Sequence, residues 1–93
     1  MDSRHVLWLP VVRDKLVLFR NTRFTPEETF DFISRLVLEI EDQLKNPIIG
    51  GTYTEEFGKY KGISRIVLKK FRIYFQQFNN EIIIVAILFP GEK

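Results

Sequence analysis

The residues best suited to chemistry gather in the last third of this 93-residue chain. Six cations and no acid lie between Lys59 and Arg72. Guanidinium and ammonium groups attract anions, and a guanidinium holds a phosphate or carboxylate through two parallel hydrogen bonds. These six cations and two nearby tyrosines are the candidates for contacting a target or an antagonist: Lys59, Tyr60, Lys61, Arg65, Lys69, Lys70, Arg72 and Tyr74. The pattern predicts a cationic face for nucleic acid or an acidic protein segment.

The same residues have a plainer interpretation. Lysine and arginine are ordinary on a solvated surface. Arg72 can instead pair with an acid of a helix that the sequence predicts between Thr25 and Lys45, the second of two predicted helices. Arg65 and Arg72 are the best individual candidates because strand positions fix side chains better than a loop fixes them. Tyr53, Tyr60 and Tyr74 can stack on bases, or two of the three can be packing residues.

If this region is catalytic, Arg65, Arg72 and Tyr74 are the candidates. The arginines would stabilise a charged transition state, and Tyr60 or Tyr74 would carry a proton. The single histidine, His5, is typical of a surface group. The chain has no cysteine, which excludes thiolate metal ligands. The acids of the second helix form a solvated face rather than a metal site: Glu39, Glu41 and Asp42. We expect neither a metal nor another cofactor.

Strands must position these cations. The pattern predicts strands over residues 62–68, 71–78 and 81–89, with Asn79-Asn80 as a hairpin turn. In the middle strand, apolar Phe71, Ile73 and Phe75 alternate with Arg72, Tyr74 and Gln76, so one side faces the core and the other is free. The last strand is apolar on both faces, which predicts a central strand covered on both sides.

The first half of the chain predicts one strand and two helices. Residues 5–9 are apolar and β-prone, and residues 10–21 have helical spacing that begins with Pro10. Thr25-Pro26-Glu27-Glu28 is a capping box that begins a second helix, which ends near Lys45 because Pro47 follows. Residues 48–60 are predicted to be a long loop. The apolar face of the second helix comprises Phe30, Ile33, Val37, Ile40 and Leu44.

These elements predict a single α+β domain over residues 1–93. The order is β-α-α-β-β-β, with a helical hairpin packed on a small antiparallel sheet. Residues 27–56 hold eight of the twelve acids, so the chain divides into an acidic middle and a basic C-terminal part. The longest apolar run, Ile82 to Phe89, has eight residues, short of the ~18 of a membrane span. The N-terminal sequence lacks a signal-peptide pattern, so we expect a cytoplasmic protein with no membrane contact.

Three segments in order resemble the RelE/ParE superfamily of toxins from type II toxin–antitoxin modules. The first is LWLP followed by a helix. The second, FTPEETFDFISRLVLEIEDQLKNPIIGG, is similar to that family's second helix, with Leu44, Pro47 and Gly50 in its closing signature. The third is SRIVLKKFRIYFQQFNNEIIIVAIL, similar to the family's aromatic-Arg-Ile pattern followed by an apolar last strand. The resemblance covers about 80 residues and implies a RelE/ParE-like fold.

The two branches of that family imply different functions. RelE-like members cleave mRNA at the ribosome and use basic residues with a C-terminal Arg and Tyr or His, whereas ParE-like members bind and poison DNA gyrase. This chain ends ILFPGEK, with Phe89, Pro90 and Gly91 where the nuclease branch has its acid/base groups. The resemblance therefore favours a ParE-like toxin associated with plasmid stabilization and growth arrest. It implies a complex with an acidic antitoxin. The alternatives are a RelE-like endoribonuclease and a degenerate, non-toxic nucleic-acid-binding module.

Overall fold

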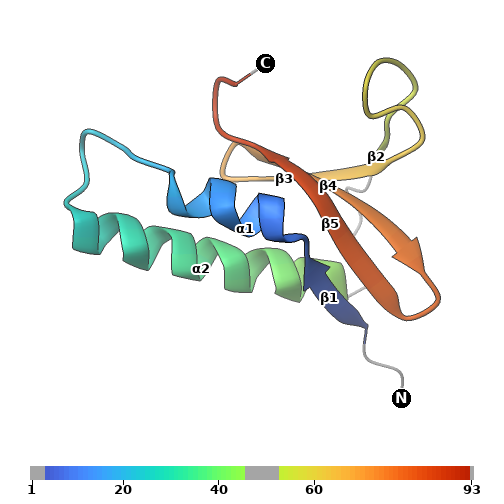
Figure 1. The fold of residues 1–93 in the computed structure, drawn as a ribbon, viewed down its shortest axis with the longest axis horizontal. Coiled ribbons are helices and arrows are strands. Elements are labelled where there is room, and N and C mark those ends of the chain that lie inside the picture. Colours follow the sequence, from blue (N-terminus) through green and yellow to red (C-terminus); the bar gives the residue numbers. More distant parts are fainter. Residues whose placement is uncertain (1–3, 46–52, 93) are drawn as a thin grey trace.

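A computed structural model describes residues 4–45 and 53–92 (Figure 1). Its elements are β1 (His5–Trp8), α1 (Pro10–Val17), α2 (Pro26–Lys45), β2 (Tyr53–Thr54), β3 (Ser64–Leu68), β4 (Phe71–Phe78) and β5 (Glu81–Leu88). The strands form one five-stranded sheet in the order β1-β5-β4-β3-β2. Both helices belong to the α+β arrangement that the sequence predicts.

The sheet is mixed, so the prediction of an antiparallel sheet is wrong at one edge. β1 pairs in parallel with β5, while the other neighbours pair antiparallel. Parallel neighbours need a long crossover, and the two helices and three strands between β1 and β5 provide one. A short strand, β2, also lies in the segment predicted as a loop, where Tyr53 and Thr54 pair with β3.

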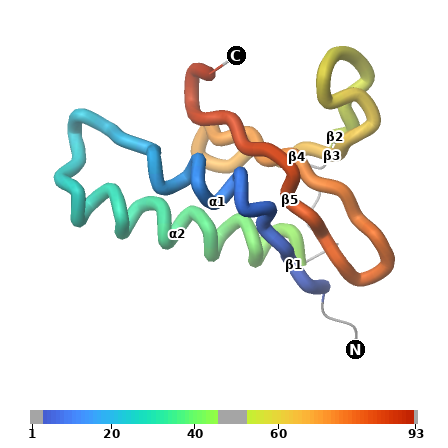
Figure 2. The backbone as a smooth tube through the Cα atoms, viewed as in Figure 1, coloured from blue at the N-terminus to red at the C-terminus, as the bar shows by residue number. Residues whose placement is uncertain are grey.

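The first helix ends four residues earlier than predicted, at Val17. Beyond it, the N–H groups of Leu18 and Phe19 donate to carbonyls three residues back, a tightening typical of helix ends. The Phe19 ring then packs 5.2 Å from both Phe71 and Phe89, measured between ring centroids. Figure 2 shows α1 and α2 side by side, joined by residues 18–25.

The second helix begins where the capping box predicts. The Thr25 N–H donates to the Glu28 carboxylate at 2.8 Å, and the Glu28 N–H donates to the Thr25 hydroxyl at 3.1 Å. Its buried face is rotated from the predicted one. Leu36 is fully buried, whereas Phe30 is 69% exposed. Leu36 follows Phe30 by six residues, which corresponds to a rotation of about 240° around a helix. The side chains of Phe30 and Leu36 therefore cannot both face the sheet.

The core lies between the helices and one face of the sheet. β4 contributes Phe71, Ile73 and Phe75, as its alternation predicts, and β5 contributes Ile82, Ile84 and Ile87. The Asn79 hairpin is present, with the Asn79 φ at 54°. β5 lies between β1 and β4, but its other side chains are only half-buried, so the prediction of two covered faces is wrong. No helix of the described residues is long and apolar enough to span a membrane.

Candidate functional site on the outer face of the sheet

The register of β3 and β4 determines which predicted residues share a face. Arg65 lies opposite Tyr74, and Val67 lies opposite Arg72. Directly opposed residues project on the same side of a sheet. The residues that alternate with them along the two strands, such as Ile73, are in the core. The side chains of these four residues therefore project from the other face of the sheet, away from the helices. We call Arg65, Val67, Arg72 and Tyr74 the outer face.

Arg65 is held by groups that the sequence did not single out as its partners. Its Nε lies 3.2 Å from the Glu55 carboxylate, and its guanidinium carbon lies 4.9 Å from the centre of the Tyr53 ring. Desolvation raises the pKa of Tyr53, and so does the carboxylate of Glu56, which accepts a hydrogen bond from the Tyr53 hydroxyl at 3.3 Å. An anion that binds Arg65 must therefore compete with Glu55.

Tyr74 is covered on the outer face by Tyr60. The two rings stack with centroids 4.1 Å apart and planes 17° from parallel, and Tyr74 is 3% exposed. Tyr60 belongs to the segment between β2 and β3, which is tied at its base by hydrogen bonds between Glu55, Gly62 and Ile63. The side of β4 predicted to be free is thus partly covered, and Tyr74 is not placed to carry a proton to or from a bound substrate.

Arg72 reaches the C-terminal turn and not the second helix. Its guanidinium donates a hydrogen bond to the backbone carbonyl of Glu92. The Glu92 carboxylate in turn accepts hydrogen bonds from Lys15 Nζ, at 2.8 Å to each oxygen, and from the Phe89 N–H at 2.8 Å. Those bonds, followed by the charges of Lys15 and Arg72, lower the pKa of Glu92 against the opposing effect of burial. The proposed pair between Arg72 and an acid of α2 is absent from the described contacts.

The lysines of the β3–β4 turn do not join the outer face. Lys69 Nζ lies 3.1 Å from Glu39 of α2 and 5.5 Å from the centre of the Phe32 ring, so Lys69 extends towards the helices. Lys70 is exposed in the turn, and both residues have positive φ, at 50° and 71°. A two-residue hairpin favours such angles, which direct these side chains differently from those of the strands.

The remaining candidates occupy the segment between β2 and β3. Lys59 and Lys61 are exposed there, and Lys59 Nζ lies 5.7 Å from the centre of the Tyr60 ring. The structure thus brings together Arg65, Arg72, Tyr74 and Tyr60, and leaves Lys69 and Lys70 apart from them.

Sequence reasoning missed two acids at this site. Glu55 neutralises Arg65, and Glu92 lies beside Arg72. A signal for Glu92 was present, because Pro90-Gly91 is a turn dipeptide that can return the chain, and Gly91 has a φ of 82°. Glu55 carried no comparable signal, since its contact depends on the pairing of β2 with β3.

Two of the three acids considered for a metal site have other partners. Glu41 accepts a hydrogen bond from the Trp8 indole N–H at 2.8 Å, and Glu39 pairs with Lys69. Residues 4–45 and 53–92 contain no group of three or more potential metal ligands. His5 is exposed on the edge strand β1.

Comparison with known proteins adds nothing to this geometry: no family model, curated protein or solved structure matches the chain.

Proposed function

We propose that this chain is the toxin of a type II toxin–antitoxin module and acts by binding, in the manner of ParE, with DNA gyrase as the target. The proposal rests on the family resemblance of the sequence together with one structural observation. Arg65 and Arg72 project from adjacent strands on the face opposite the helices. A rigid sheet that presents two guanidinium groups on one side suits an anionic protein surface.

The contacts of the two arginines suggest how an antitoxin neutralises the toxin. Glu55 forms an ion pair with Arg65, and the Glu92 carbonyl accepts a hydrogen bond from Arg72, so both arginines of the outer face already have a partner within the chain. An acidic antitoxin segment would replace these acceptors and cover the exposed Val67 between the arginines. The partner is therefore a small acidic protein that orders on binding and forms a hetero-oligomer with the toxin.

The geometry favours binding over RNA cleavage. Tyr74 lies beneath Tyr60, and Arg72 contacts the backbone of Glu92, whose carboxyl has a lowered pKa and is ionised at neutral pH. An ionised carboxylate held by Lys15 is unsuited to donating a proton. The endoribonuclease nevertheless remains the competing proposal that experiment must address.

Induction of the chain in growing bacteria tests the proposal. Growth arrest together with inhibition of purified gyrase in a supercoiling assay is the expected result. Cleavage sites in mRNA by primer extension, without gyrase inhibition, would instead establish the endoribonuclease. Normal growth at full expression would establish a non-toxic module.

Arginine variants test the outer face itself. Arg65→Ala and Arg72→Ala should each weaken gyrase inhibition roughly tenfold, the effect of losing one charge-assisted contact. Arg23→Ala is the matched control because Arg23 is exposed in the α1–α2 connection. Arg72→Lys, which keeps the charge but loses the planar guanidinium, should fall between wild type and Arg72→Ala. Unchanged inhibition by folded Arg65→Ala and Arg72→Ala would exclude the outer face.

A further inference from the structure

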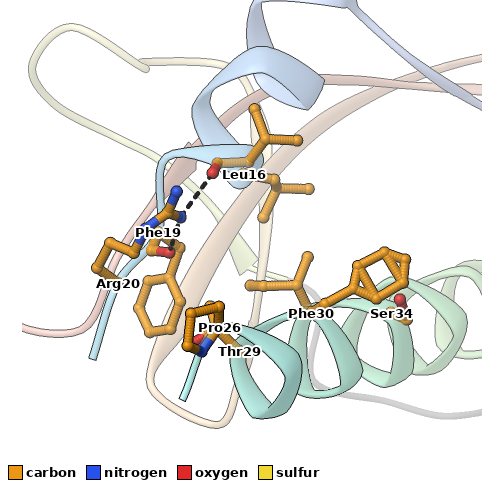
Figure 3. Close-up of a pocket in the computed structure, with 9 residues that line it drawn as sticks. Leu16, Phe19, Arg20, Pro26, Thr29, Phe30 and Ser34 are labelled. Carbon is orange, nitrogen blue, oxygen red and sulfur yellow. Dashed lines mark hydrogen bonds between the residues drawn. The ribbon is translucent and has the colours of Figure 1, made fainter. Parts of the chain in front are cut away.

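The helical layer leaves an apolar groove open on its surface. A cavity of about 270 Å³ lies between α1 and α2, and Figure 3 shows Leu16 on one side with Phe30 and Ser34 on the other. A second cavity of about 270 Å³ continues along the helices and shares Leu16, Val17 and Ile33 with the first. The groove therefore extends along most of α1.

A stripe of exposed side chains on α2 begins at this groove, which Phe30 and Ser34 line, and continues to Leu38 beyond it. Phe30, Ser34 and Leu38 are spaced by four residues, so they lie on one side of the helix. Phe30 is 69% and Leu38 65% exposed, and Val17 of α1 is exposed to a similar degree. Contiguous exposed apolar groups of this kind mark interaction sites on soluble proteins.

The charges beside the groove are self-complementary. Arg20, just beyond α1, lines one cavity and Arg13 of α1 the other, whereas α2 provides Glu41 in the second cavity and Glu27 in its first turn. An acidic segment, the partner expected at the outer face, would meet the acids of α2 here. A surface that carries both signs, one on each side of the groove, fits a second copy of itself.

We propose that the groove is the interface of a homodimer in which the two α2 helices pack antiparallel about a two-fold axis at Ser34. Residue 30 then lies opposite residue 38 of the second copy, and residue 27 lies opposite residue 41. Phe30 packs against Leu38, and the small Ser34 allows the helices to approach closely. Burial of the two phenylalanines supplies the hydrophobic driving force.

The same geometry assembles a balanced charge cluster at each end of the interface. Arg20 and Glu27 of one copy meet Glu41 and Arg13 of the other, giving two arginines and two glutamates. Arg13 and Glu41 line the same cavity within one copy, so the antiparallel arrangement, which places residue 27 opposite residue 41, brings Glu27 of the other copy towards Arg13. A parallel arrangement would instead place Glu27 opposite Glu27 and Glu41 opposite Glu41 of the second copy, so that like charges meet.

Sedimentation equilibrium of the full chain over a concentration series tests the dimer. The expected mass rises from 11.1 kDa to twice that value. Phe30→Asp should weaken self-association at least about tenfold without unfolding the chain, because its side chain is mostly exposed. Phe57→Asp is the control, since Phe57 is 82% exposed in the segment between β2 and β3, and it should dimerise as wild type does.

Charge exchange identifies the arrangement. Arg13→Glu and Glu27→Arg each unbalance the end cluster and should weaken association, whereas the double variant restores two charges of each sign and should recover it. A mass of 11.1 kDa at every concentration would overturn the proposal, as would equal behaviour of the Phe30 and Phe57 variants. Failure of the double variant to recover association would overturn the antiparallel arrangement. A monomer in which Phe30→Asp abolishes binding of a co-expressed antitoxin would assign the groove to that protein and refute the dimer.

Discussion

Replacing Glu92 with glutamine removes the negative charge from the turn that ties the C-terminal residues to α1. In the native chain, Lys15 Nζ donates to both carboxylate oxygens at 2.8 Å and also to the Ile87 carbonyl at 2.7 Å. The Phe89 N–H donates to the same carboxylate. Glu92 thus connects α1 to the end of β5 over a separation of 77 residues in the chain from Lys15.

The free energy at stake follows from these contacts and their exposure. The side chains of Lys15 and Glu92 are 31% and 38% exposed, so water screens much of their attraction, and an exposed ion pair contributes at most about 1 kcal/mol. The charged hydrogen bond from the Phe89 N–H adds a similar amount. Because a glutamine side chain at this position still accepts a hydrogen bond, we expect Glu92→Gln to lower the free energy of unfolding by about 1 kcal/mol at pH 7, which corresponds to roughly 4–8 °C in Tm.

The difference in free energy of unfolding between wild type and Glu92→Gln has a defined dependence on pH. The pKa of Glu92 in the folded chain is lowered from its ordinary value of 4.5. Its stabilisation is therefore fully present above about pH 4.5 and is lost as the pH falls through the folded pKa. Urea unfolding of wild type and Glu92→Gln, followed by circular dichroism from pH 7 to pH 3, should show two curves that converge in acid. The other carboxylates titrate in both proteins, so the difference isolates Glu92.

Glu81→Gln is the matched control because Glu81 is exposed at the start of β5; it should match wild type within about 0.5 kcal/mol at every pH. Equal stability of Glu92→Gln and wild type at pH 7 would refute the assigned role of the Glu92 carboxylate. A difference that does not shrink as the pH falls below about 4.5 would refute it too, because the stabilisation by the carboxylate is lost as the pH falls through its lowered pKa.

Two further predictions concern the core and the outer face. At a concentration at which the chain is monomeric, Leu36→Ala should destabilise the fold by about 2–5 kcal/mol in urea unfolding, because the side chain is fully buried, whereas Phe30→Ala should cost well under 1 kcal/mol; comparable losses would show that the assigned orientation of α2 is wrong. Tyr60→Ala should remove the ring that covers Tyr74, which costs about 0.5–1.5 kcal/mol and reduces the near-ultraviolet circular dichroism of the tyrosines. An unchanged spectrum would show that the two rings do not stack in solution.

The local parts of the fold were predictable from sequence. The capping box of Thr25 and Glu28 involves residues three apart, so its hydrogen bonds form wherever that helix forms. β4 has the predicted bounds because its alternation spans the whole strand, and Asn79 marks the turn that follows it. Each of these features depends on neighbours within a few residues.

The candidate site was predictable in part. Alternation along β4 and β3 placed Arg65 and Arg72 on strands, and the register then put them on one face. The same reasoning failed for Lys69, because a turn with positive φ redirects its side chain towards Glu39 of α2. No pattern in the sequence specifies which acid a flexible lysine will reach.

Hydrophobic periodicity, capping and composition are local properties, and they were enough to predict the helices, the main strands and the concentration of positive charge near the C-terminus. The parallel pairing of β1 with β5, the exposure of Phe30 and the covering of Tyr74 by Tyr60 became known only from the folded chain. The same holds for Glu55 and Glu92 as partners of the two arginines of the outer face. These contacts join residues that different elements carry, and their geometry exists only once the core has fixed those elements relative to one another.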